Sequence, residues 1–147
     1  MRLAVDTNVL VYAEGQEAPE KTETARRLLG SRELSVVVPV QVLGEFFRVV
    51  TGRYAWTREK AQQSISVFRR VFDVSPTTVA AFDDALELAT AHRLQIWDAI
   101  IVGVAREAGC AILLSEDMQD GFAWSGVTVV NPFAEPMPAA LSRAIQS

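Results

Sequence analysis

The sequence predicts an α/β fold, in which helices cover both faces of a mainly parallel sheet of four or five strands. Short apolar stretches of strand length alternate along the chain with longer segments that have helical spacing. The strand segments, such as RLAVD and LSVVVP, are apolar at consecutive positions, which is typical of strands that are buried on both faces. We find no internal repeat or low-complexity tract, so these 147 residues are expected to form one domain.

The chain is expected to open with a strand and two helices. Residues 2–6 are apolar but too few for a helix, so they are interpreted as a buried strand. The helix expected at residues 7–15 has Thr7 or Asn8 as a suitable N-cap. Residues 18–33 place charges among alanines and leucines and are interpreted as a second helix, which a glycine ends.

A second strand and a pair of helices follow. Residues 34–39 are β-branched and end at Pro39, which indicates another buried strand. Pro39 also suits the first turn of the next helix, expected to run to residue 52. After a short loop, Thr57 is expected to cap a helix at residues 58–71.

The second half repeats the alternation of strands and helices. The expected strands are residues 72–76, 110–115 and 126–132, and the expected helices are residues 77–92 and 97–109. Residues 116–122 are interpreted as a turn or short helix. The last residues are interrupted by proline and then weakly helical, which fits either a docked arm or a frayed end.

Composition limits the kinds of partner and compartment. The formal net charge of -4 argues against a protein that grips nucleic acid through bulk charge, so a nucleic-acid partner would need a local basic patch or bound cations. The single cysteine, Cys110, excludes an intramolecular disulfide. Strand-forming residues follow Met1 at once and leave no room for a signal peptide, and the longest apolar run is too short to span a bilayer. A cytoplasmic protein without a membrane partner is expected.

Four acidic residues are placed by this pattern near the carboxyl ends of the strands, where open parallel sheets bind ligands. One ends the first strand, one lies just past the end of the fourth strand, one lies in the first turn of a helix, and one lies about two turns into the helix after the second strand. They are Asp6, Asp117, Asp98 and Glu45. Each also has an ordinary explanation as a helix cap, a turn residue or a solvated helix residue.

Four carboxylates at one edge would repel one another, and a divalent ion would remove that cost. Oxygen ligands of this kind suit Mg²⁺ or Mn²⁺. No other catalytic arrangement is evident: His92, the only histidine, is expected to be a surface or packing residue, and no nucleophile elbow or phosphate loop is present. Metal-activated water is the remaining strong nucleophile, which points to phosphodiester cleavage.

The stretches VDTNVLVY, VLGEFFR, WDAIIV and LLSEDMQDG occur in this order and contain the four acids. With them the chain closely resembles the PIN-domain ribonucleases, and in particular the VapC-type toxins of type II toxin–antitoxin pairs. The resemblance implies a three-layer α/β/α nuclease domain over residues 1–133, followed by a tail at residues 134–147. It also implies a Mg²⁺- or Mn²⁺-dependent endoribonuclease that acts on RNA, forms a homodimer and is silenced by an antitoxin protein.

The resemblance also implies roles for individual residues. Asp6 and Asp98 would be the most direct metal ligands, with Glu45 and Asp117 completing the acidic set. The residues implied to orient this set are Thr7, Ser115 and Asn8, of which Asn8 is expected to hydrogen-bond to Asp6. In the last motif, Glu116 and Asp120 compete with Asp117 for the fourth acidic role.

A helix pair from Val40 to Arg70, called the clip below, concentrates basic and aromatic residues. The residues expected to bind RNA or an antitoxin are Arg48, Arg53, Tyr54, Trp56 and Arg69, with Arg58, Lys60 and Arg70 nearby. Phosphate contacts and base stacking would suit single-stranded RNA. An ordinary solvated helix pair explains the same residues.

Three other functions fit parts of the pattern. A dehalogenase-like phosphatase also begins with an acid at a strand end, but it needs a second acid two residues later, where this chain has Asn8. A non-catalytic binding module would have no reason to keep four repelling acids. A DNA nuclease on a related fold would differ mainly in its substrate.

Overall fold

The computed structural model describes residues 1–146 and confirms the alternation of strands and helices. The strands of this part of the chain are β1 (Arg2–Val5), β2 (Ser35–Pro39), β3 (Asp73–Ser75), β4 (Ile112–Leu114), β5 (Ala123–Trp124) and β6 (Val127–Val130). Its helices are α1 (Thr7–Ala13), α2 (Pro19–Leu29), α3 (Val40–Gly52), α4 (Arg58–Val71), α5 (Val79–Ala91), α6 (Ile96–Glu107) and α7 (Ala139–Gln146).

The strands form one sheet in the order β3-β2-β1-β4-β6-β5. All neighbouring strands are parallel except β5 and β6, which are antiparallel. The sheet therefore has one strand more than the largest expected number. The additional strand, β5, has two residues and lies at the edge of the sheet. A segment this short has no periodicity that could reveal it.

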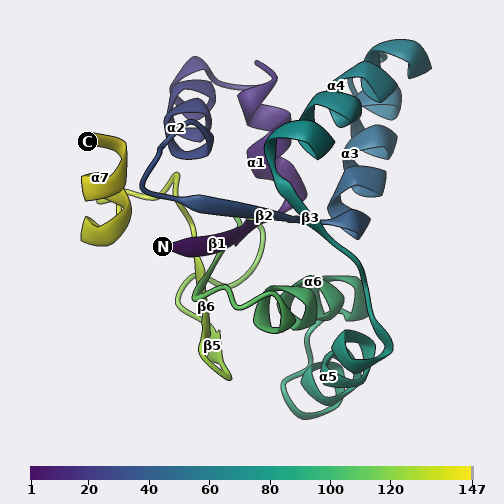
Figure 1. Ribbon diagram of the computed structural model, residues 1–147, viewed down its shortest axis with the longest axis vertical. Helices are drawn as coiled ribbons and strands as arrows, with labels where there is room; N and C mark the ends of the chain where they lie inside the picture. Colours follow the sequence, from purple (N-terminus) through teal and green to yellow (C-terminus); the bar gives the residue numbers. More distant parts are fainter. Residues whose placement is uncertain (147) are drawn as a thin grey trace.

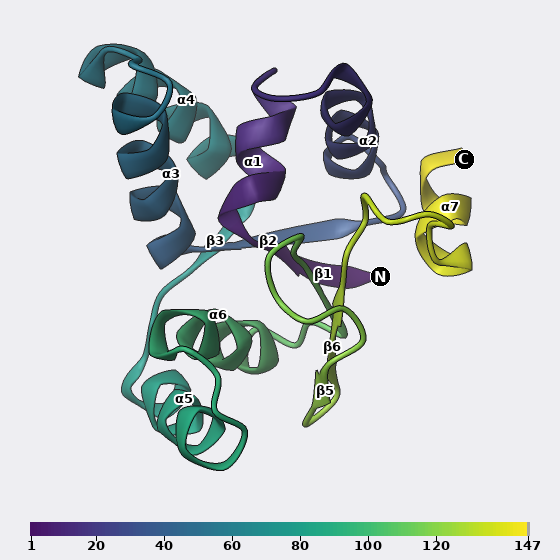
Figure 2. The ribbon, with the colours of Figure 1, turned by 180° about the vertical axis from the view of Figure 1, so that it is seen from behind.

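Helices cover both faces of the sheet, as the buried strands predicted. Figure 1 shows α1 to α4 on one face and α5 with α6 on the other, and the view from behind in Figure 2 shows the same three layers. The central strands supply a core of fully buried residues that includes Leu3, Val5 and Val37. Each such aliphatic side chain contributes roughly 1.5–3 kcal/mol by leaving water.

Parallel strands bring their carboxyl ends to one edge of the sheet. In this sheet β1 lies between β2 and β4, with Ala4 aligned to Val37 on one side and to Leu113 on the other. The residues that follow these three strands are therefore neighbours in space although they are far apart in the sequence.

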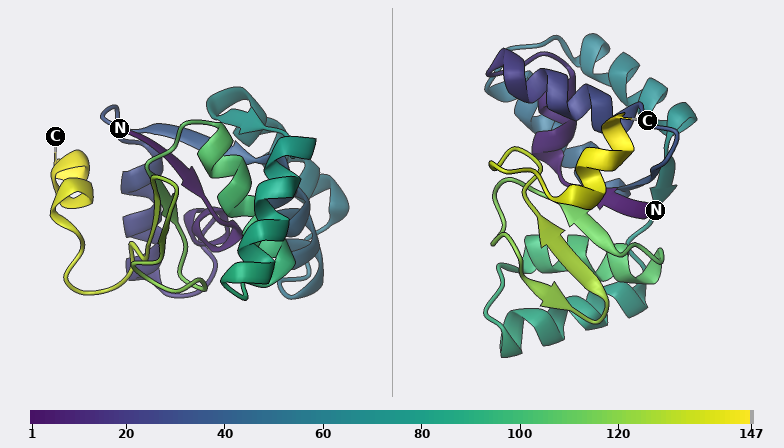
Figure 3. Two further views of the ribbon diagram at one scale, coloured as in Figure 1. Left: turned by 90° about the horizontal axis from the view of Figure 1, so that it is seen from below. Right: turned by 90° about the vertical axis from the view of Figure 1, so that its left-hand side faces the viewer.

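The tail folds into α7, which packs beside α2. Leu141 is fully buried, and Ser31 Oγ donates a hydrogen bond to the carbonyl oxygen of Ala144 at 2.7 Å. Figures 1 and 3 place α7 at the end of the molecule opposite α3 and α4. The described part of the tail is thus a docked helix that lies far from the clip, while Ser147 lies outside the described residues. No helix in residues 1–146 has both the length and the apolar character needed to cross a membrane.

The close packing of α5 on α6 depends on Gly103. A Cβ atom added at this position would lie 2.5 Å from the carbonyl oxygen of Ala81, and a backbone atom cannot move aside as a flexible side chain can. We expect Gly103→Ala to lower the free energy of unfolding by about 1–3 kcal/mol, the usual cost of overpacking a core. Urea denaturation followed by circular dichroism measures this change.

Gly44, in the middle of α3, offers a matched control because a Cβ there has no neighbour within 4 Å. Gly44→Ala is expected to stabilise the protein by roughly 0.5–1 kcal/mol, since alanine favours a helix more than glycine does. Equal effects of the two substitutions would contradict the proposed close contact.

Candidate functional site

Asp6 lies immediately after β1 and is only 5% exposed. Its Oδ1 accepts a hydrogen bond from the backbone N–H of Thr7 at 2.8 Å, and its Oδ2 accepts one from Ser115 Oγ at 2.7 Å. Asp6 is also the N-cap of α1. The prediction that Thr7 or Asn8 would cap this helix is therefore wrong, because the strand ends one residue earlier and leaves Asp6 in the extended conformation that a cap requires.

The environment of Asp6 opposes ionisation. Its pKa is raised to about 6, chiefly by burial; the hydrogen bonds from Ser115 and Thr7 partly oppose this rise, and the negative charges of Asp98 and Glu45 contribute smaller increases. The charges of Asp98 and Glu45 act on Asp6 although these residues come from two different helices. The three carboxylates are thus electrostatic neighbours.

Thr7 and Asn8 connect the first turn of α1 to two further acids. Thr7 Oγ1 donates to Glu45 Oε2 at 2.7 Å, and Asn8 Nδ2 donates to Asp117 Oδ2 at 3.2 Å. Asn8 Oδ1 also accepts a hydrogen bond from the backbone N–H of Glu116 at 3.2 Å. The expectation that Asn8 hydrogen-bonds to Asp6 is wrong, because its side chain faces the loop after β4 and orients Asp117 instead.

Asp98 lies in the first turn of α6, as expected, and Gln95 caps this helix by accepting the backbone N–H of Asp98 at 3.0 Å. Partial burial raises the pKa of Asp98, and the negative charges of Glu45 and Asp117 raise it further. Two carboxyl groups of the site therefore have raised pKa values, and like charges contribute to both.

The four predicted acids line one cavity of about 260 Å³. Its lining also includes Thr7, Asn8, Arg48, Arg53 and Tyr54. None of the four acids takes part in an ion pair with a basic side chain in residues 1–146. The cavity thus gathers negative charge that the described side chains do not neutralise by direct pairing.

These carboxylates fit a hard divalent cation in chemistry and in charge. Oxygen donors are the ligands that Mg²⁺ and Mn²⁺ prefer, and a cation would offset the repulsion that raises the pKa of Asp6. In the described part of the chain, however, no three His, Cys, Asp or Glu side chains are already arranged around a common point as a metal site. Completing a coordination shell therefore requires water ligands or small rotations of side chains, and Mg²⁺ usually keeps several waters.

The two rivals of Asp117 do not line the cavity, and both are held by other groups. Glu116 accepts a hydrogen bond from Tyr12 and pairs with Lys21 at 2.7 Å. Although burial alone would raise the pKa of Glu116, the bonds from Lys21 and Tyr12 lower it below its usual value. Asp120 Oδ1 accepts the backbone N–H of Asn131 at 3.0 Å. Asp117 is the acid of this loop that lines the cavity.

Only some of the predicted clip residues line the cavity. Arg53 pairs with Glu17 at 2.8 Å, and Tyr54 donates a hydrogen bond to the same carboxylate, so both residues are held at the rim of the cavity near Arg48. Trp56 instead packs edge-on against Phe46, with a ring separation of 6.0 Å. Arg69 is exposed on α4 and is absent from the lining of the cavity.

Trp97 was not predicted as a functional residue. Its side chain is 58% exposed, which is unusual for tryptophan, and it lines a second hollow of about 670 Å³ with Glu45 and Arg48. Gln41 joins the two helices here, because its Nε2 donates to Glu45 Oε1 at 2.8 Å and to the carbonyl oxygen of Trp97 at 3.1 Å. The sequence signal was a tryptophan directly before Asp98, in the first turn of a helix.

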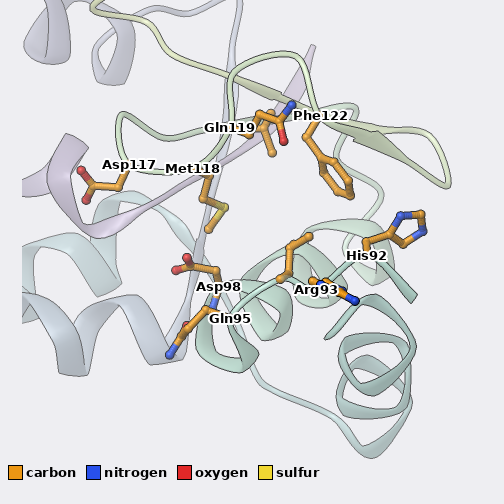
Figure 4. A pocket seen from close by; sticks show the side chains of 10 residues that line it. His92, Arg93, Gln95, Asp98, Asp117, Met118, Gln119 and Phe122 are labelled. Atoms are coloured by element: carbon orange, nitrogen blue, oxygen red, sulfur yellow. The ribbon is translucent and has the colours of Figure 1, made fainter. Parts of the chain in front are cut away.

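A third hollow, of about 250 Å³, shares Asp98 and Asp117 with the acidic cavity. Figure 4 shows its side chains, which come from the segment between α5 and α6, the first turn of α6, the loop between β4 and β5, and β6. Asp98 thus lines all three hollows.

Comparison with known proteins places this geometry in context. The sequence model of the PIN domain matches residues 3–122. The comparison with curated proteins returned no match.

Solved structures with the same fold come from several organisms. One is VapC20 from Mycobacterium tuberculosis, described as a sarcin-ricin loop cleaving toxin, with 23% identity, a TM-score of 0.63 and coverage of 76% of this chain and 86% of that chain. Another is VapBC2 from Rickettsia felis bound to a promoter DNA fragment, with 16% identity, a TM-score of 0.66 and coverage of 88% and 97%. A toxin–antitoxin complex from Klebsiella pneumoniae has 18% identity, a TM-score of 0.65 and coverage of 89% and 98%. At these identities the likeness establishes a shared fold.

Proposed function

The chain belongs to the PIN-domain family, and from this premise we propose that it is a Mg²⁺- or Mn²⁺-dependent endoribonuclease that acts as the toxin of a toxin–antitoxin pair. The observation that carries the proposal is the gathering of Asp6, Glu45, Asp98 and Asp117 around one cavity without a basic side chain paired to any of them among residues 1–146. A purely structural site would have no use for this repulsion.

In this proposal Asp6 and Asp98 hold the metal most directly, and Glu45 and Asp117 complete the site. When bound, the ion supplies Lewis acidity that activates water and neutralises the charge developing on the phosphate. Ser115 and the backbone N–H of Thr7 fix both oxygens of Asp6, so this carboxylate is presented in one orientation. Thr7 orients Glu45 by a hydrogen bond to one of its carboxylate oxygens, and Asn8 orients Asp117 in the same way.

The basic residues at the rim are proposed to hold the RNA. Arg48 and Arg53 line the acidic cavity and can contact phosphates on either side of the cleaved bond. Tyr54 supplies an aromatic ring beside Arg53, whose guanidinium carbon lies 5.3 Å from the ring centre. Trp56 and Arg69, which lie outside this cavity, remain predicted contacts of RNA or an antitoxin.

The partner proteins are proposed from the fold neighbours. The structure from Klebsiella pneumoniae is described as a toxin–antitoxin complex. We extend that association to this chain: an antitoxin protein would bind the clip and cover the acids, and two copies of the chain would form a homodimer in the cytoplasm. The negative charge of the whole chain favours a local contact through the clip arginines over a broad electrostatic attraction.

A direct test is cleavage of RNA by the purified chain, freed from any partner. We expect single-stranded RNA to be cut internally in the presence of Mg²⁺ or Mn²⁺, and the cleavage to stop when EDTA removes the metal. Single-stranded DNA of the same sequence, incubated in parallel, should stay intact, and gel electrophoresis of end-labelled strands resolves both. The absence of cleavage of any RNA pool under either metal would contradict the proposal, and cleavage of the DNA alone would favour a DNA nuclease.

One observation favours a second function, a non-catalytic module that binds a partner protein. No three acids in the described chain are already arranged as a metal site, and a scaffold that has lost its ion has no need of such an arrangement. The two functions differ in metal binding, because a scaffold should gain no stability from Mn²⁺. Unfolding free energies measured with and without Mn²⁺ separate them.

A further inference from the structure

The third hollow, here called the Met118 cavity, has no role in the cleavage chemistry described above. Its lining includes Arg93, Gln95, Met118, Gln119 and Phe122, together with the acids Asp98 and Asp117. Figure 4 shows Met118 and Phe122 reaching from the β4–β5 loop toward Asp98, Arg93 and His92 on the opposite side. A group bound in this cavity would therefore lie directly beside the acidic site.

We propose that the Met118 cavity binds one unstacked nucleobase of the RNA, next to the bond that is cut, and so contributes to the choice of cleavage site. The proposal names the substrate contact of the same site and rests on the ribonuclease function proposed above. Proteins that select RNA sequences mostly do so by holding single unstacked bases against flat or soft side chains and reading their edges.

The size and walls of the cavity suit one base. Its volume of about 250 Å³ is below the roughly 300–1,000 Å³ of sites for drug-sized molecules, which leaves room for a single ring system and little more. Met118 provides a polarisable wall, and Phe122 provides an aromatic one. The ring of Phe122 is steadied by an edge contact with His92, at a centroid distance of 5.7 Å and an interplanar angle of 74°.

One amide side chain of the lining is free to read the edge of a base. Gln119 is exposed, and its side chain makes no hydrogen bond to another group in residues 1–146. Gln95, by contrast, uses its Oε1 to cap α6 through the backbone N–H of Asp98, and Figure 4 shows its amide group turned away from Met118 and Phe122. A free amide group has one acceptor oxygen and two donor hydrogens. These can pair with the donors and acceptors along the edge of a base.

Arg93 supplies the positive charge that the phosphate of the bound nucleotide would need beside this acidic site. It takes part in no ion pair within the described residues. Its backbone has a φ of 58°, in the left-handed region that follows many helices and that glycine normally occupies. The chain therefore keeps an arginine where glycine would be less strained, which favours a role for the side chain itself.

Nuclear magnetic resonance of the full chain, labelled at the methionine methyl groups and free of metal, tests the proposal without relying on activity. AMP, GMP, CMP and UMP are added separately, with ribose 5-phosphate as the probe without a base. We expect at least one nucleotide to shift the Met118 methyl resonance saturably, while ribose 5-phosphate does not. The methyl group of Met137, in the segment before α7, serves as an internal reference.

Substitutions identify the groups responsible. Arg93→Gly and Gln119→Ala should each weaken nucleotide binding by about tenfold, the scale of losing one hydrogen bond that includes a charge. Arg93→Gly should also raise the melting temperature, since glycine relieves the left-handed backbone, so its effect on binding cannot come from misfolding. Arg32→Gly, in the turn before β2 at the opposite edge of the sheet, removes the same charge and should leave binding unchanged.

Several results would overturn the proposal: no saturable shift of Met118, an equal shift with ribose 5-phosphate, or unchanged binding in both cavity variants. Sequencing of RNA fragments separates this proposal from the nuclease proposal. If the wild type cuts RNA and both variants keep its base preference at the cleavage site, the base subsite is refuted and the nuclease stands. If nucleotides bind as expected but no RNA is cut, the nuclease is refuted and base binding stands.

Discussion

Replacing Asp6 by asparagine is expected to reduce RNA cleavage by about 10³-fold or more, the scale seen when a central catalytic group is removed. The amide would keep the size of the side chain and an oxygen for the backbone N–H of Thr7, but it would remove the negative charge proposed to hold the metal. End-labelled RNA incubated with Mg²⁺ or Mn²⁺ gives the rate. If Asp6→Asn kept full activity, this would contradict the proposal that Asp6 holds the catalytic metal ion.

The same substitution is expected to stabilise the metal-free protein near neutral pH. Burial, with smaller contributions from the charges of Asp98 and Glu45, raises the pKa of Asp6 from 3.8 to about 6, a net shift that corresponds to about 3 kcal/mol against the charged form. Part of this gain is offset because the amide makes a poorer hydrogen bond with Ser115, so a net stabilisation of about 1–2 kcal/mol is expected. Asp83→Asn, at an exposed position on α5, is the matched control and should change neither activity nor stability.

The stability of the metal-free protein is expected to fall as the pH rises from about 4 to 6. In this range the folded state binds a proton at Asp6 more tightly than the unfolded chain does, because the folded pKa is about 6 and the ordinary value is 3.8. The stabilising contribution of the protonated carboxyl is complete below pH 4 and is lost once the pH passes 6. The raised pKa of Asp98 acts in the same direction.

Urea denaturation in EDTA at several pH values, on the wild type and on Asp6→Asn, isolates this effect. The difference in unfolding free energy between the two proteins should change by about 3 kcal/mol across the range, since other titrating groups cancel. A difference that is independent of pH would show that Asp6 is not held in the unfavourable environment described.

Binding of a metal ion at pH 7 should restore the unfolding free energy that is lost when Asp6 ionises. An ion present at about 100 times its dissociation constant stabilises the folded state by roughly 2.7 kcal/mol. We expect Mn²⁺ to raise the unfolding free energy of the wild type on this scale and to have little effect on Asp6→Asn. A binding scaffold without a metal site would show no such difference.

The sequence alone was sufficient for the architecture and for the position of the acids along it. Consecutive apolar residues identified the buried strands, and their alternation with helices placed Asp6 and Asp117 near strand ends and Asp98 in the first turn of α6. These features depend on neighbours in the chain, so a local pattern reveals them. The edge strand β5 escaped notice because two residues form no pattern.

Only the tertiary structure decided which groups face one another. Asn8 bonds to Asp117 instead of Asp6, Glu116 is held by Lys21 and Tyr12, and Trp97 is exposed beside the acids. These contacts join residues that are as much as 109 positions apart, and each depends on the direction in which a side chain leaves its helix or loop. The spacing of residues in the sequence determines whether a segment forms a helix or a strand and which residue lies at its end. The partner of each side chain is set by packing across the sheet.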